Sequence, residues 1–217
     1  MKKIDLSTWG RKSVYNYFGT FSNPCYGFNV EMDITSLVKN VKERKTSFFI
    51  DMLYLVYLGL ESVEAMRTRI VNDEVVVYDM INPSYTVMTD LHFFENAGVK
   101  ATHDYQEFYR RVHEDVEKTK TKGFIKDGYN DSKLMDDYYI TCIPWLSFES
   151  MTHPLPNNDP SNSSVPRVCW GKYYEKDGHY KIMLNITVSH QLVDGKELSE
   201  TFLAIQSNFD QADTLLR

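Results

Sequence analysis

Cysteine is scarce in this 217-residue sequence: Cys25, Cys142 and Cys169 are the three present, and no two of them form a CxxC pair. Zinc ribbons and thioredoxin-type redox sites need paired cysteines, so this spacing argues against both classes. Three widely separated thiols are more typical of a reducing cytoplasm than of a secreted, disulfide-stabilised protein. We therefore predict a cytoplasmic protein that needs no disulfide to fold.

Long apolar runs and an excess of positive charge are also missing. The longest apolar stretch, residues 48–60, is broken by Asp51 and Glu61, and is too short to cross a bilayer. The N-terminal residues MKKID begin with basic side chains but reach no apolar segment, so they do not resemble a signal peptide. A net charge of −6 argues against a general nucleic-acid or membrane surface.

The histidines lack the close spacing of a metal site. Five of the six fall in segments that are predicted to be loops or solvated faces: His92, His103, His113, His153 and His179. None of them is spaced from another as metal ligands usually are. We therefore expect no metal ion.

What the sequence does contain is an ordinary globular composition, 42% hydrophobic and 14% aromatic, with helix and strand periods interleaved. Apolar residues recur at a helical period in residues 46–70, 104–120 and 196–209. Strands are predicted at residues 74–78, 85–88, 138–148, 167–174 and 179–189. Asp177-Gly178 predicts a hairpin turn between the last two strands, and segment 155–166 is expected to be a surface loop.

No linker, repeat or composition shift divides the chain, so we predict one domain over residues 1–217. A domain of this length buries roughly 70% of the surface of its unfolded chain, which is enough for stability without a metal or a disulfide. Several strands are far apart in sequence and helices lie between them. This order predicts an α+β fold in which helices pack on a sheet.

Residues 189–195, with the sequence SHQLVDG, carry the strongest chemical signal. His190 follows a predicted buried strand, and Asp194-Gly195 leads into the last helix. Histidine is suited to proton transfer near neutral pH, and the end of a strand would hold its ring in place. The tight turn argues against Asp194 as a partner of His190; we expect a buried carboxylate that needs a cation. The alternative is a histidine satisfied by its packing beside an ordinary Asp-Gly turn.

This HxxxDG pattern resembles the signature of the CoA-dependent acyltransferases, which include the chloramphenicol acetyltransferases and the dihydrolipoyl acyltransferase cores. Over nearly the whole chain, further motifs resemble the chloramphenicol acetyltransferases in their order: Trp9-Gly10-Arg11-Lys12, Tyr17-Phe18, Pro24-Cys25, residues 30–34 and 83–86, Ile143-Pro144-Trp145 and Gly171-Lys172-Tyr173-Tyr174. The N-terminal motifs favour this family over the dihydrolipoyl cores. The resemblance implies a two-layer α+β sandwich, in which helices cover a mixed β-sheet.

The resemblance also implies an O-acetyltransferase with acetyl-CoA as its co-substrate. His190 matches the general base, which deprotonates the acceptor hydroxyl for direct attack on the thioester. Thr141, four residues before Trp145, matches the hydroxyl that hydrogen-bonds the tetrahedral intermediate, where the family usually has serine. Arg11 matches the arginine that pairs with the motif aspartate, here Asp194.

Binding positions and assembly are implied in the same way. The residues that match the acceptor pocket or the CoA side of the family are Tyr17, Phe18, Cys25, Phe28, Trp145, Cys169, Lys172 and Tyr173. The family is a homotrimer with active sites between subunits, so a homotrimer is expected for this chain.

Several departures from the family bear on the acceptor. Ser189 replaces the first of two adjacent histidines, Cys169 stands where many members have threonine, and the stretch between residues 149 and 166 is longer and more polar. Chloramphenicol is the first acceptor expected; another hydroxyl compound, or another acyl-CoA, is the alternative. A non-catalytic binding protein of the same fold is a third reading, disfavoured because all four matched site residues are present.

Overall fold

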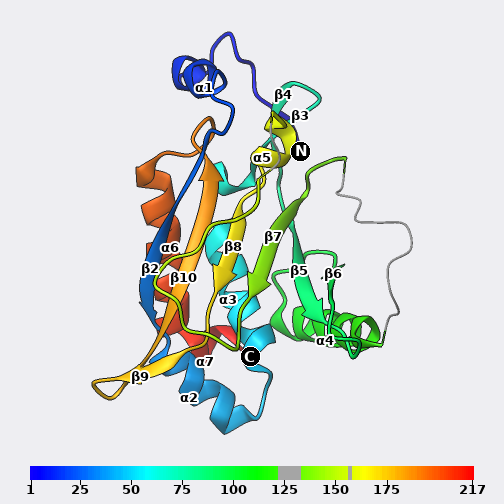
Figure 1. The fold of residues 1–217 in the computed structure, drawn as a ribbon, viewed down its shortest axis with the longest axis vertical. Coiled ribbons are helices and arrows are strands. Elements are labelled where there is room, and N and C mark those ends of the chain that lie inside the picture. The colour runs from blue at the N-terminus through cyan, green and yellow to red at the C-terminus, as the bar shows by residue number, and fades with distance from the viewer. Residues whose placement is uncertain (122–132, 156–157) are drawn as a thin grey trace.

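The computed structural model describes residues 1–121, 133–155 and 158–217, and its centre is a seven-stranded mixed sheet (Figure 1). Its strands are β2 (Cys25–Asp33), β5 (Asn82–Met88), β6 (Phe94–Gly98), β7 (Asp137–Cys142), β8 (Arg167–Trp170), β9 (Tyr174–Lys176) and β10 (His179–Ser189). They follow the order β2-β10-β8-β7-β5-β6, with β9 paired to β10. The pairs β8–β7 and β7–β5 are parallel, and the others are antiparallel.

Helices cover one face of this sheet (Figure 1). They are α2 (Thr35–Arg44), α3 (Phe48–Glu61), α6 (Gly195–Asp210) and α7 (Ala212–Leu215), with α4 (Tyr105–Lys120) beside β5 and β6. The remaining elements are α1 (Lys12–Phe18), η1 (Glu64–Arg67), α5 (Pro160–Ser163) and a small sheet of β1 (Lys2–Lys3), β3 (Thr68–Val71) and β4 (Glu74–Val77). The predicted two-layer α+β sandwich with a mixed sheet is confirmed.

The alternation of side chains in β10 builds the core. Ile182, Leu184, Ile186 and Val188 are all buried and face the helices, as their spacing predicts. The hairpin between β9 and β10 turns at Asp177 and Gly178, both with positive φ (53° and 79°), which is the turn that Asp-Gly favours. None of the helices in the described ranges has the length and apolar character needed to cross a membrane.

Helices α3 and α6 approach each other closely at Gly59. A Cβ at this position would lie 2.3 Å from the Cγ1 of Ile205 and 3.1 Å from its backbone. Glycine is therefore required here by the contact between the helices, although it weakens the helix itself.

The predicted helix over residues 46–70 is correct only as far as Glu61. Helix α3 begins after Ser47, whose side chain accepts a hydrogen bond from the backbone N–H of Ile50. After η1 the chain becomes extended, and β3 turns into β4 at Asn72 and Asp73, both with positive φ. Two runs rich in β-branched residues around such a turn form a hairpin, and this local signal decides the structure there.

Two predicted strands are too long for a common reason. Strand β7 ends at Cys142, not at residue 148, and β8 ends at Trp170, before β9 begins. The chain from residue 143 to 155 leaves the sheet and crosses the face opposite α3 and α6 (Figure 1). At Gly171 a Cβ would lie 3.0 Å from the carbonyl oxygen of Leu146, so the crossing segment interrupts the strand.

The prediction of a surface loop over residues 155–166 is wrong for most of the residues that the structure describes there. Asp159 caps the short helix α5, and residues 162–166 are buried. The hydroxyl of Ser164 accepts a hydrogen bond from the backbone N–H of Ile70 at 3.0 Å, which anchors the segment against β3. Residues 156 and 157 lie outside the described residues.

Candidate active site

His190 stands directly after β10, with its ring packed between two aromatic rings. The ring of Phe18 is stacked on the imidazole at a centroid distance of 4.0 Å and an interplanar angle of 11°. Tyr26 lies on β2 with its centroid 4.5 Å away. The backbone N–H of His190 donates to the carbonyl of Pro24 at 2.9 Å. Packing and backbone together hold the imidazole in one place.

Arg11 secures the turn that follows His190. Its guanidinium donates to both carboxylate oxygens of Asp194, at 2.5 and 2.6 Å, which is the bidentate geometry of strong pairs. It also donates to the carbonyl oxygens of Gln191 at 3.0 Å and His190 at 2.8 Å. The hydrogen bond from Arg11 is the main reason that the pKa of Asp194 is lowered. The arginine–aspartate pair implied by the family resemblance is present.

Two sequence-based expectations about Asp194 are wrong. Its side chain is 40% exposed, so it is not a buried carboxylate. Its Oδ1 lies 3.2 Å from Nδ1 of His190, although the tight turn was expected to keep them apart. The turn folds back because the backbone N–H groups of Leu192 and Val193 both bond to the carbonyl of Ser189. The contact is electrostatic, since Nδ1 makes no hydrogen bond of good geometry within the described residues.

Thr141 lies on β7, far from His190 in the same chain. The register of the sheet places Thr141 beside Cys169 of β8, and Cys169 beside Asn185 of β10. His190 comes five residues after Asn185 (190 − 185). That distance is about 16 Å along β10, and two strand spacings add roughly 10 Å across the sheet. A single chain therefore does not bring the two predicted catalytic residues together.

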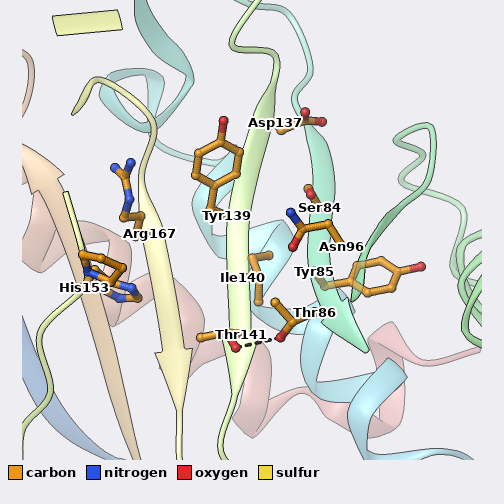
Figure 2. Close-up of a pocket in the computed structure, with 11 residues that line it drawn as sticks. Ser84, Tyr85, Thr86, Asn96, Asp137, Tyr139, Ile140, Thr141, His153 and Arg167 are labelled. Atoms are coloured by element: carbon orange, nitrogen blue, oxygen red, sulfur yellow. Dashed lines mark hydrogen bonds between the residues drawn. The ribbon is translucent and has the colours of Figure 1, made fainter. Parts of the chain in front are cut away.

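A pocket of about 250 Å³ opens beside Thr141, on the face of the sheet that the helices leave uncovered (Figure 2). The Oγ1 of Thr141 lies 2.7 Å from the Oγ1 of Thr86 on β5. The other lining residues are Ser84, Tyr85, Asn96, Asp137, Tyr139, Ile140, His153, Pro154 and Arg167. Apart from Thr141, the sequence singles out no residue of this pocket as functional. Alternation along β5 could have placed Thr86 on the Thr141 face, but not at a hydrogen-bond distance.

A second pocket, of about 310 Å³, lies on the other side of Thr141. Most of its lining is apolar: Met88, Phe94, Cys142, Ile143, Pro144 and Trp145, with Thr86 and Thr141 at its polar end. The Trp145 side chain is 65% exposed and is therefore not core. Thr141 thus stands between a polar pocket and an apolar one, which would let two different chemical groups meet at its hydroxyl.

Several of the predicted binding residues gather near His190. Tyr17 is exposed and its ring packs against Phe18 at a centroid distance of 5.1 Å. Phe28 is 37% exposed, and its ring lies 3.9 Å from where a Cβ on Gly195 would be. The thiol of Cys25, opposite Ser189 in the sheet, donates to the carbonyl of Ser163, 3.6 Å away.

The others lie along β8 and beyond its end. Cys169, beside Thr141, is fully buried, and burial raises the pKa of its thiol to about 12. Lys172 is exposed, and its backbone N–H donates to the carbonyl of Leu146, next to Trp145. Tyr173 packs against Phe48 and Tyr180. No three His, Cys, Asp or Glu side chains in the described ranges are grouped to hold a metal ion.

Comparisons with known proteins show the family to which the chain belongs. The family model for chloramphenicol acetyltransferase matches residues 1–206. A chloramphenicol acetyltransferase of Proteus mirabilis is 27% identical over 216 residues, which cover 96% of this chain and 94% of the relative. One of Campylobacter coli is 31% identical over 197 residues, covering 89% and 90%. A solved chloramphenicol acetyltransferase matches with a TM-score of 0.84 at 23% identity, covering 96% of this chain and 100% of that one. The chain belongs to the chloramphenicol acetyltransferase family.

Proposed function

We propose that the chain transfers the acetyl group of acetyl-CoA to a hydroxyl group of a small acceptor, with His190 as the general base. Family membership makes it an acetyl-CoA-dependent acyltransferase. Chloramphenicol, the acceptor in the names of its relatives, is the first acceptor to test. The observation that carries the role of His190 is its ring, clamped between Phe18 and Tyr26 beside a turn that Arg11 secures.

The geometry supports different roles for the two ring nitrogens. Nδ1 faces the carboxylate of Asp194 at 3.2 Å, so Nε2 is the nitrogen that would accept the proton of the acceptor hydroxyl. The acceptor oxygen then forms a bond to the thioester carbonyl carbon, and the tetrahedral intermediate breaks its C–S bond. The leaving CoA thiolate recovers the proton from Nε2. The nearby carboxylate stabilises the imidazolium that exists between these two steps.

Thr141 would stabilise the intermediate by donating a hydrogen bond to its oxyanion. In one chain, Thr141 and His190 are separated by about 16 Å in the direction of β10, before the spacing across the sheet is added. We therefore infer that each active site joins His190 of one copy to the Thr141 pocket of a second copy. A homotrimer, as the family resemblance implies, would supply three such sites. The contact surface would include the exposed aromatic side chains around His190.

The first test measures the release of CoA thiol from acetyl-CoA with chloramphenicol and with a panel of other alcohols. Loss of a positioned general base typically lowers the rate by about 10²–10⁴-fold, and His190→Ala should do so. His113→Ala, an exposed histidine on α4, is the matched control and should retain activity. Turnover of another alcohol, dependent on His190, would keep the mechanism and change the acceptor. Equal rates for His190→Ala and the wild type would refute the base assignment.

A second test refolds two impaired variants together, His190→Ala and Thr141→Val. If the site is shared between copies, mixed assemblies contain some interfaces with both residues intact, and activity returns. If the mixture is no more active than the separate variants although mass spectrometry shows mixed assemblies, the shared site is wrong. Sedimentation of the wild type tests the trimer independently.

Two predictions from the sequence remain to be tested. A single domain over residues 1–217 predicts one cooperative unfolding transition, without a protease-resistant subdomain. A cytoplasmic location predicts recovery of the protein in the cytoplasmic fraction of its own cells.

A further inference from the structure

His153 lies in the segment that crosses the open face of the sheet, and its side chain lines the polar pocket beside Thr141 (Figure 2). The residue is half-buried, in contrast to the solvated position that its sequence context predicts. Its Nε2 lies 3.1 Å from the Oδ1 of Asn185 on β10. The contact connects the crossing segment to β10 and fixes one side of the imidazole.

The neighbours of Asn185 decide which ring nitrogen of His153 carries the proton. The Asn185 amide nitrogen donates to the carbonyl of Phe28 at 3.3 Å and to the side-chain oxygen of Asn29 at 3.0 Å. Its oxygen accepts a hydrogen bond from the hydroxyl of Thr187 at 3.1 Å. The oxygen must therefore accept from His153 as well, so Nε2 is the donor. Burial lowers the pKa of His153, which leaves the ring neutral at neutral pH, with Nδ1 as a hydrogen-bond acceptor.

The rest of the pocket is also rich in hydrogen-bonding groups. Ser84, Thr86 and Asn96 add two hydroxyls and an amide to the hydroxyl of Thr141. Its charged side chains, Asp137 and Arg167, are one acid and one base, so the residues that line the pocket carry no net charge. The volume of about 250 Å³ is smaller than the ~300–1,000 Å³ typical of sites for drug-sized ligands. These features favour a small, uncharged ligand with several polar groups.

We propose that this pocket binds a small, uncharged acceptor with several hydroxyl groups, one of which donates a hydrogen bond to Nδ1 of His153. The inference rests on the proposed acetyl transfer and names the substrate class of that site. His153 acts as a specificity residue, and the proton transfer is left to His190. An aryl surface packed against Nδ1 would desolvate this nitrogen without replacing its hydrogen bond, and a buried acceptor left unpaired disfavours binding.

The protonation of His153 is measured first, because it does not depend on activity. In ¹⁵N-histidine-labelled wild-type protein, Nε2 of His153 should resonate as a protonated nitrogen and Nδ1 as an unprotonated one. Addition of methyl glucoside or sorbitol, without acetyl-CoA, should shift the Nδ1 resonance. A protonated Nδ1, or no shift with any compound of the panel, would overturn the proposal.

Three variants then test specificity in acetyl transfer. His153→Leu removes the acceptor atom and should lower kcat/KM for the preferred polyhydroxylated compound by about tenfold, relative to chloramphenicol. His153→Gln, which retains an acceptor oxygen, should lose less, and His113→Leu should behave as wild type. His153→Gln also keeps the test valid if His153→Leu folds poorly.

The outcomes separate this inference from the proposed function. A wild type that prefers chloramphenicol over every polyhydroxylated compound would overturn the inference while leaving acetyl transfer intact. So would a His153→Leu variant whose preference between the two kinds of acceptor is unchanged from that of the wild type. Binding of methyl glucoside at His153 without any acetyl transfer would support the pocket assignment and remove the proposed function.

Discussion

The hydroxyl oxygens of Thr86 and Thr141 lie 2.7 Å apart, on the neighbouring parallel strands β5 and β7. One of the two hydroxyls donates its proton to the other. Thr141 can offer its own proton to an oxyanion only while it accepts the proton of Thr86. Thr86 is therefore a positioning residue for the proposed oxyanion donor.

Substitution of these two threonines should lower kcat to different degrees. Thr141→Val removes the oxyanion donor and should cost on the order of 100-fold in kcat. Thr86→Val leaves that donor in place without its partner, and should cost about tenfold. The double variant should be no slower than Thr141→Val, because both changes act through one proton. Steady-state rates test this, with Thr214→Val near the C-terminus as the control. A Thr86→Val enzyme with the kcat of the wild type would show that Thr141 needs no orientation.

Arg11→Lys should be nearly as damaging as Arg11→Ala, because an ammonium cannot reproduce the four hydrogen bonds that the planar guanidinium makes. We expect a loss of about 2 kcal/mol in the free energy of unfolding, discounted for the exposed side of Asp194. The loss in kcat should exceed what the loss of folded protein explains, since the turn carries His190. Urea denaturation and kcat measured side by side test this, with the exposed neighbour in Lys12→Ala as the control. Wild-type stability of Arg11→Lys would contradict it.

The Arg11–Asp194 pair also predicts a pH dependence of stability. The pKa of Asp194 is lower in the folded protein than its ordinary value of 3.8. The pair thus stabilises the fold above that value, and the contribution is lost as the pH falls through the lower pKa of the folded state. The difference in unfolding free energy between wild type and Asp194→Asn should shrink as the pH falls below about 4. Asp213→Asn, an exposed carboxylate, is the control. A difference that grows at acid pH would reverse the sign of the effect.

Gly59→Ala should destabilise the fold, although alanine favours a helix by about 1 kcal/mol. The new Cβ would lie 2.3 Å from a side-chain atom of Ile205 and 3.1 Å from its backbone, so α3 and α6 must separate. Such overpacking typically costs about 1–3 kcal/mol and exceeds the gain in propensity. Gly10→Ala, with no atom within 4 Å of the new Cβ, is the matched control. Thermal melting compares the two, and a higher melting temperature for Gly59→Ala would refute the prediction.

The features that the sequence predicts well depend on local signals. The alternation in β10, the Asp177-Gly178 turn and the amphipathic helix α4 each fit within one window of the chain. The hairpin of β3 and β4 is also local, but apolar residues at a helical spacing run up to Met66 and hide the turn at Asn72 and Asp73. The helix was predicted there from the periodicity of the apolar residues, but the residues of the turn determine the structure.

The arrangement of the site could not be predicted from spacing, because it depends on register between distant strands. Thr141 and His190 are separated by the pairing of β7 with β8 and of β8 with β10, which no local pattern specifies. The contact of His153 with Asn185 arises only because the segment after β7 crosses the sheet. The Arg11–Asp194 pair was anticipated from a family resemblance, not from physical chemistry alone.

The link between Arg11 and Asp194 joins residues 183 positions apart, and this has a consequence for synthesis on the ribosome. At about 5–20 residues per second, Arg11 emerges roughly 10–40 s before its partners exist. Strand β10, which lies between β2 and β8, is made in the same late interval. Until then β2 has no strand partner in the described sheet, because it pairs there with β10. Strand β10 and the turn that carries His190 therefore join the sheet in one last step.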